Sequence, residues 1–85
     1  MTERIVKTND KEANQILNGE KTYFIRSDKD LYQIGYIIRF QNMRLAKPVY
    51  HQIQRIKYEV TQVDNWQTAP LKKGYQLISV RECND

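Results

Sequence analysis

The sequence is poor in the residues that build cross-links and metal centres. Its 85 residues include one cysteine, Cys83, and one histidine, His51. A single cysteine excludes an intrachain disulfide, and no group of cysteines or histidines is present to hold zinc. A lone histidine without a second ligand is typical of a surface residue, and Cys83 near the chain end is most simply incidental. We therefore expect no metal, no cofactor and a reducing, cytoplasmic setting.

Long apolar runs are also absent. Residues 1–7 lack the apolar stretch of a signal peptide, and no segment approaches the roughly 20 apolar residues that cross a bilayer. A chain of 85 residues has the length of one domain with a modest core. We expect a single domain over residues 1–85, soluble, monomeric or weakly dimeric, with a shallow cleft as its site.

Local patterns predict one helix near the start of the chain. Asn9 and Glu12 have the spacing of a capping box, and Gly19 lies where a glycine commonly ends a helix. These signals predict a helix over residues 10–18. A turn or one short helical turn is expected over residues 31–35.

Runs rich in β-branched and aromatic residues predict the strands, over residues 4–8, 22–26, 36–40, 49–63 and 75–81. The run 49–63 changes parity, which indicates one long strand or two strands broken by a bulge. Residues 42–48 and 65–73 are predicted loops. The fold class is therefore α+β and β-rich: a curled, mostly antiparallel sheet or pseudo-barrel of five to six strands, with one or two short helices. An OB-like or SH3-like barrel remains an alternative.

The positive charge is concentrated in the middle of the chain. The net charge is +4, and residues 31–58 contain five basic residues and no acidic one. Tyrosines and a phenylalanine alternate with these cations, which is the composition of a surface that follows a phosphate backbone and stacks bases. The alternative is that the aromatics build the core and the cations are only solvated. The candidate nucleic-acid contacts in this block are Arg39, Arg44, Lys47, Tyr50 and Arg55.

The segment GEKTYFIR, residues 19–26, carries the other candidates. It places Lys21 at the start of a predicted strand and Arg26 at its far end. Two cations beside a glycine suit a phosphate or a carboxylate if both face one groove. The alternative is a helix cap followed by two solvated charges, because such short patterns are weak.

This segment resembles the signature GxKxxExR of the ASCH domains, a branch of the PUA-like superfamily, and it follows directly on the first helix. RSDKDLYQIG with the following Ile37-Ile38, and LKKGYQLISV near the end, resemble RxxDRxFxVGDxL and LKxGYxxLxI of a small uncharacterised bacterial ASCH-like family. Together these segments cover most of residues 9–80. The resemblance implies a PUA-like fold that binds RNA or a nucleotide, with Gly19, Lys21 and Arg26 at the signature positions.

The chain departs from the signature at two places. Phe24 stands where the signature has glutamate, and Tyr36 replaces the acidic residue that usually follows Gly35. In a regular strand Phe24 and Arg26 share one face, so Arg26 loses the carboxylate partner that the signature glutamate would supply and gains an aromatic neighbour. Arg26 and Phe24 then form a candidate pair for a phosphate and a base. Equally, Phe24 faces the core.

Three functions follow. The first is a module that binds RNA or a nucleotide through Lys21, Phe24, Arg26 and the basic block. The second is implied by the resemblance: some ASCH proteins are amidohydrolases acting on acylated cytidines, through a motif lysine, a nearby threonine and a distant glutamate, and some are reported to be ribonucleases. Here Lys21 is the candidate catalytic residue, Phe24 occupies the threonine position, and Glu59 is the available acid, so binding is expected rather than hydrolysis. The third is a protein-interaction module with an exposed apolar patch.

Overall fold

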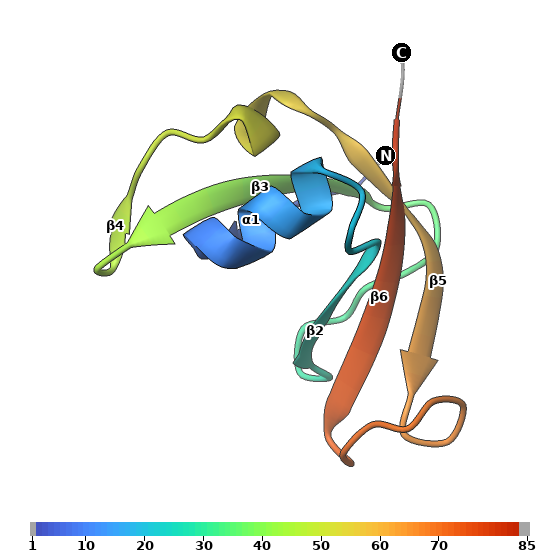
Figure 1. The fold of residues 1–85 in the computed structure, drawn as a ribbon. Coiled ribbons are helices and arrows are strands. Elements are labelled where there is room, and N and C mark those ends of the chain that lie inside the picture. The colour runs from blue at the N-terminus through green and yellow to red at the C-terminus, as the bar shows by residue number, and fades with distance from the viewer. Residues whose placement is uncertain (1, 84–85) are drawn as a thin grey trace.

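Strands dominate residues 2–83, the part of the chain that the structure, a computed structural model, describes (Figure 1). The elements are β1 (Glu3–Thr8), α1 (Asp10–Leu17), β2 (Tyr23–Ser27), β3 (Ile37–Arg44), β4 (Lys47–Pro48), the 3-10 helix η1 (Gln52–Arg55), β5 (Tyr58–Asn65) and β6 (Tyr75–Glu82). The prediction of a β-rich α+β fold is confirmed. Within this part of the chain, no helix has the length and apolar character needed to span a membrane.

The strands form one bent sheet whose two edges are β1 and β2. The order is β1-β3-β5-β6-β2, and β4 pairs with the end of β3. β1 runs parallel to β3, and the other pairs are antiparallel. The sheet is therefore mostly antiparallel, as predicted. The sheet curls around α1 (Figure 1) without closing, because no strand pairing joins β1 to β2. We call this unpaired boundary between β1 and β2 the seam.

The helix forms where the local signals predict it. At its start the Asn9 side chain accepts a hydrogen bond from the backbone N–H of Glu12 at 2.8 Å. At its end Gly19 has a φ of +78° and donates its N–H to the carbonyl of Ile16. This left-handed conformation is the reason for glycine at this position. Ala13 and Ile16 are buried against the sheet, so the helix fills the concave side.

The core lies between α1 and the sheet and is built around aromatic rings. Phe24 packs edge-to-face against Tyr32 and Phe40, with ring centroids 5.6 Å apart in both pairs. Phe40 makes a similar contact with Tyr58 at 5.3 Å. Most of the aromatic residues in the middle of the chain therefore pack in the core. This agrees with the interpretation in which the aromatic residues build the core, and not with the one in which they stack on bases.

Two segments differ from the prediction. Residues 42–48, expected to be a loop, continue β3, turn at Leu45 and Ala46 and return as β4. Residues 49–57, expected to be strand, contain η1 instead. The reason is local, because the His51 side chain accepts a hydrogen bond from the N–H of Ile53 at 3.1 Å and caps this short helix. The expected bulge is present, but it lies within β5, after Val60.

Candidate anion-binding site

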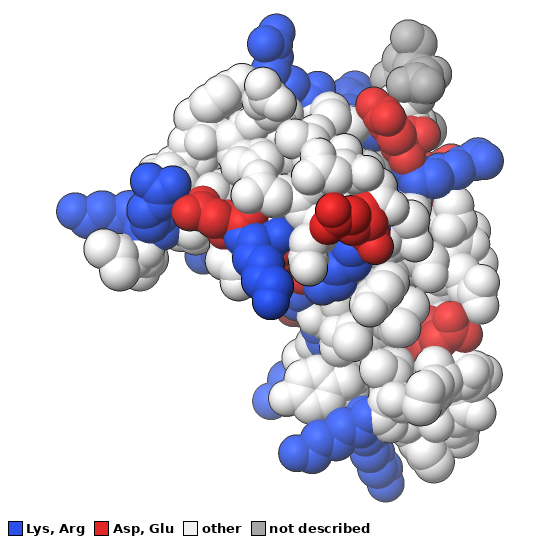
Figure 2. Space-filling view, viewed as in Figure 1, with Lys and Arg blue, Asp and Glu red and all other residues white. Residues whose placement is uncertain are grey.

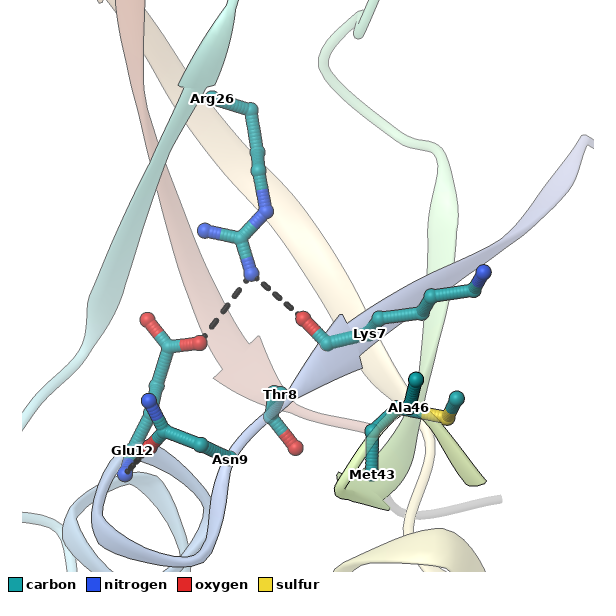
Figure 3. Close-up of a pocket in the computed structure, with 7 residues that line it drawn as sticks. All are labelled: Lys7, Thr8, Asn9, Glu12, Arg26, Met43 and Ala46. Atoms are coloured by element: carbon teal, nitrogen blue, oxygen red, sulfur yellow. Dashed lines mark hydrogen bonds and ion pairs between the residues drawn. The ribbon is translucent and has the colours of Figure 1, made fainter. Parts of the chain in front are cut away.

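A pocket of about 590 Å³ lies at the seam, where β1, the start of α1, β2 and the β3–β4 hairpin come together (Figure 3). We call it the Arg26 pocket. Arg26 reaches into it from β2, and the hairpin forms the opposite wall. Its lining residues are Lys7, Thr8, Asn9, Glu12, Arg26, Met43 and Ala46.

The Arg26 side chain crosses the seam and is held by three acceptors. Nη2 donates to the backbone carbonyl of Lys7 at 2.7 Å and to Glu12 Oε1 at 3.1 Å, and Nη1 donates to the carbonyl of Ile25 at 2.7 Å. A guanidinium has five N–H groups in a planar fork. Within residues 2–83, two of the five have no protein acceptor. Arg26 is therefore fixed in position and keeps donors for an anion.

Glu12 is the residue that sequence reasoning missed. Its carboxylate accepts from Arg26 Nη2 and from Lys21 Nζ, both at 3.1 Å, and the side chains of Glu12, Lys21 and Arg26 are only 15%, 24% and 27% exposed. The expectation that Phe24 leaves Arg26 without a carboxylate partner is wrong, because α1 supplies one. The three charges sum to +1. The sequence contained one signal for this position of Glu12. Glu12 and the apolar Ile16 are four positions apart, so they share the helix face that packs on the sheet.

Thr8 adds an unusual polar group to the pocket wall. The residue is buried, and its hydroxyl Oγ1 has no hydrogen-bond partner among the described residues. A buried hydroxyl without a partner costs free energy, of the order of 1–3 kcal/mol. Oγ1 is shielded from solvent, so it lies behind the pocket surface and not on it.

Phe24 and Arg26 share one face of β2, as the alternation predicts, but the ring is fully buried. The Arg26 guanidinium lies 5.3 Å from the centre of the ring. Of the two interpretations of Phe24, the structure has the one in which it faces the core. The ring is therefore not available to stack on a base. Its contact with the site is the one with the Arg26 guanidinium.

Lys21 joins the same carboxylate as Arg26 but opens onto a different cavity. It lines a pocket of about 150 Å³ between the end of α1 and β6, together with residues that include Tyr58 and Arg81. The two signature cations thus converge on Glu12, not on one ligand pocket. Arg26 is the signature residue that faces the larger pocket.

The hairpin carries two of the block cations, each next in sequence to a residue that lines the Arg26 pocket. Arg44 forms an ion pair with Asp10 at 3.1 Å, and Lys47 lies opposite Arg44 across the turn. The hydrogen bond from Asn42 and then the contacts of Arg44 hold the pKa of Asp10 below its usual value, against the opposing effect of burial. Figure 2 shows basic side chains at the hairpin end, beside acidic side chains of the helix face.

The remaining predicted contacts lie away from the Arg26 pocket. Arg39 pairs with Glu3 at 3.2 Å, from β3 to β1. Tyr50 and Arg55 are exposed on the segment that follows β4. The acid-free block is therefore partly neutralised by acids from β1 and α1, which its sequence alone does not reveal.

Comparison with known proteins gives no match: no protein-family model and no curated protein matches the chain. Among residues 2–83, no group of three or more His, Cys, Asp or Glu side chains is arranged to hold a metal ion.

Proposed function

We propose that the domain binds RNA or a nucleotide through a phosphate group held by Arg26. The observation that carries the proposal is the guanidinium of Arg26, which three protein acceptors fix at the wall of a pocket of about 590 Å³ while two of its N–H groups stay uncommitted within the described chain. Each free N–H of a guanidinium can donate a charge-assisted hydrogen bond to a phosphate oxygen. The pocket volume is within the usual range of small-molecule sites.

The surroundings of the pocket support an anionic ligand with hydrogen-bonding groups. Lys7 is exposed and lines the pocket, so a second cation lies beside it. The net charge of +4 favours the approach of polyanions. The resemblance of residues 19–26 to the ASCH signature points to the same class of ligand.

Hydrolysis is the second candidate, favoured by one observation: Glu12 gives Lys21 the carboxylate partner that the sequence did not reveal. The Lys21–Glu12 ion pair nevertheless supports binding and not hydrolysis. Lys21 meets Glu12 as an ammonium, which has no lone pair for attack on a substrate. Lys21 also lies outside the larger pocket, and Phe24 fills the position of the threonine. We therefore place binding above catalysis.

The test is titration of a fluorescently labelled single-stranded RNA 12-mer with the protein, followed by anisotropy. We expect weak binding whose affinity falls roughly 15-fold between about 50 and about 200 mM NaCl, if about three phosphates are contacted. Arg26→Gln should abolish most of this binding.

Arg81→Gln is the matched control, because it removes the same charge from an exposed arginine that pairs with Glu59 away from the Arg26 pocket. It should leave the affinity nearly unchanged, and circular dichroism should show that both variants are folded. Equal losses in the two variants would mean that only general charge matters. No binding at low salt would favour the interaction module instead.

A further inference from the structure

The turn of the β3–β4 hairpin has a backbone that its residues do not favour. Leu45 has a φ of +51° and Ala46 a φ of +63°. Two-residue hairpin turns with both residues in this left-handed region strongly prefer Asn-Gly or related pairs, because other side chains are strained there. Leu45 is also 92% exposed. Neither backbone preference nor burial in the core accounts for leucine at this position.

The flanking residues add a second unfavourable feature. Arg44 and Lys47 are direct partners across the turn. Like charges at such a position repel each other. Asp10 fixes Arg44, with contacts of 3.1 and 3.3 Å, whereas exposed Lys47 has no ion pair within residues 2–83. The hairpin tip therefore presents one apolar side chain between two cations.

The tip is continuous with the proposed ligand site. Met43 and Ala46, on either side of Leu45, both line the Arg26 pocket (Figure 3). In Figure 1 the hairpin extends away from the rest of the sheet, and Figure 2 shows basic side chains at that end. A chain molecule with one phosphate at Arg26 has the hairpin tip beside it.

We propose that the hairpin tip is a second contact for single-stranded RNA, in which Leu45 packs on the face of an unstacked base and Arg44 and Lys47 hold the neighbouring phosphates. This inference rests on the proposed function and narrows its ligand to a strand of several nucleotides. Apolar side chains beside cations contact bases in this way in other nucleic-acid complexes. Backbone strain concentrates at functional sites. One leucine offers too little apolar area to anchor the domain to a membrane.

The test is the double substitution Leu45→Asn with Ala46→Gly, which installs the residues that the turn prefers. We expect the melting temperature to rise by about 4–8 °C, since the backbone strain is relieved. Affinity for the labelled RNA 12-mer should fall about tenfold, because the apolar contact is lost. Affinity for adenosine monophosphate should not change in the single variant Leu45→Asn, which leaves the pocket-lining Ala46 in place. The salt dependence of RNA binding should also stay the same, because no phosphate contact is removed.

Leu31→Asn is the matched control, since Leu31 is 67% exposed and lies outside the Arg26 pocket. It should leave RNA affinity unchanged. Leu45→Phe keeps the length of the turn and enlarges the apolar surface, so it should bind RNA more tightly than the wild type.

The outcomes separate this inference from the proposed function. Unchanged RNA affinity in the double variant, or no gain from Leu45→Phe, overturns the role of Leu45. The proposed function stands in that case if Arg26→Gln still abolishes binding. An equal loss in the Leu31 control would also overturn the inference. A wild-type protein that binds no RNA at low salt would overturn both proposals.

Discussion

Replacement of Glu12 by glutamine should lower folding stability and raise RNA affinity at the same time. The carboxylate accepts hydrogen bonds from Lys21 and Arg26, each at 3.1 Å, in a cluster that is largely shielded from solvent. Charge-assisted hydrogen bonds contribute about 1.5–3 kcal/mol when shielded, and exposed ion pairs about 0–1 kcal/mol. Because an amide oxygen still accepts, we expect a loss of about 1–2 kcal/mol. This corresponds to a fall in melting temperature of about 5–15 °C.

The effect on affinity has the opposite sign because Glu12 repels the ligand. The cluster of Glu12, Lys21 and Arg26 carries +1, and Glu12→Gln raises it to +2. A phosphate on Arg26 would lie roughly 6 Å from the carboxylate, where the repulsion amounts to about 1 kcal/mol at an effective dielectric constant between those of protein surface and water. Removal of this repulsion should tighten RNA binding about fivefold.

Thermal unfolding by circular dichroism and RNA anisotropy titration measure the two effects on one sample. The control is Glu20→Gln, which removes the same charge from an exposed residue without an ion pair within residues 2–83. The reasoning is refuted if Glu12→Gln melts at the same temperature as the control, or if the two variants bind RNA equally well.

Three further predictions concern single residues. Gly19→Ala should cost about 1 kcal/mol and leave RNA affinity unchanged, because the added Cβ meets no atom and only the strain at φ +78° remains; a thermal melt checks this. The pKa of Asp10 is lowered from 3.8, first by Asn42, so Asp10 stabilises the fold above pH 3.8 and loses this contribution as the pH falls through its folded-state pKa; urea unfolding between about pH 5 and pH 2 should show a flatter acid limb in Asp10→Asn. Finally, ultraviolet spectra should show no hydrolysis of N4-acetylcytidine, and turnover that disappears in Lys21→Ala would make the protein an enzyme.

The parts of the fold that depend on residues close together in the sequence could be predicted. The helix was placed correctly because Asn9 and Gly19 act through hydrogen bonds within the helix ends. Ile37 and Ile38 stand together in an apolar run of the predicted strand over residues 36–40, and both are buried. The loop after β5 was also expected, since residues 65–73 carry Pro70 and few apolar side chains.

The errors arose where the usual local signals are missing. Leu45 and Ala46 form a tight turn without the glycine or asparagine that usually indicates one in a sequence. Residues 42–48 were therefore predicted to be a loop and not a hairpin. His51 caps η1, although histidine is not among the common capping residues. The parallel pairing of β1 with β3 joins segments about 34 positions apart, and no local pattern specifies such a partner.

The candidate site was predictable only in part for the same reason. Arg26 and Lys21 were found through their resemblance to a signature within one segment. Glu12 and Thr8 enter the site because α1 and β1 fold against β2, which is a matter of tertiary structure. For Phe24, alternation showed that it shares a face with Arg26, but only the packed core determines that this face points inward.

The position of β2 in the sheet determines when the Arg26 pocket forms during folding. β2 pairs with β6, and its residue Tyr23 lies opposite Ser79, more than half the chain away. A strand cannot be secured before its partner has been synthesised, and such distant pairings form late and slowly. Until β6 has left the ribosome, Arg26 therefore lies on an unpaired strand, and the Arg26 pocket forms only after β6 has paired with β2.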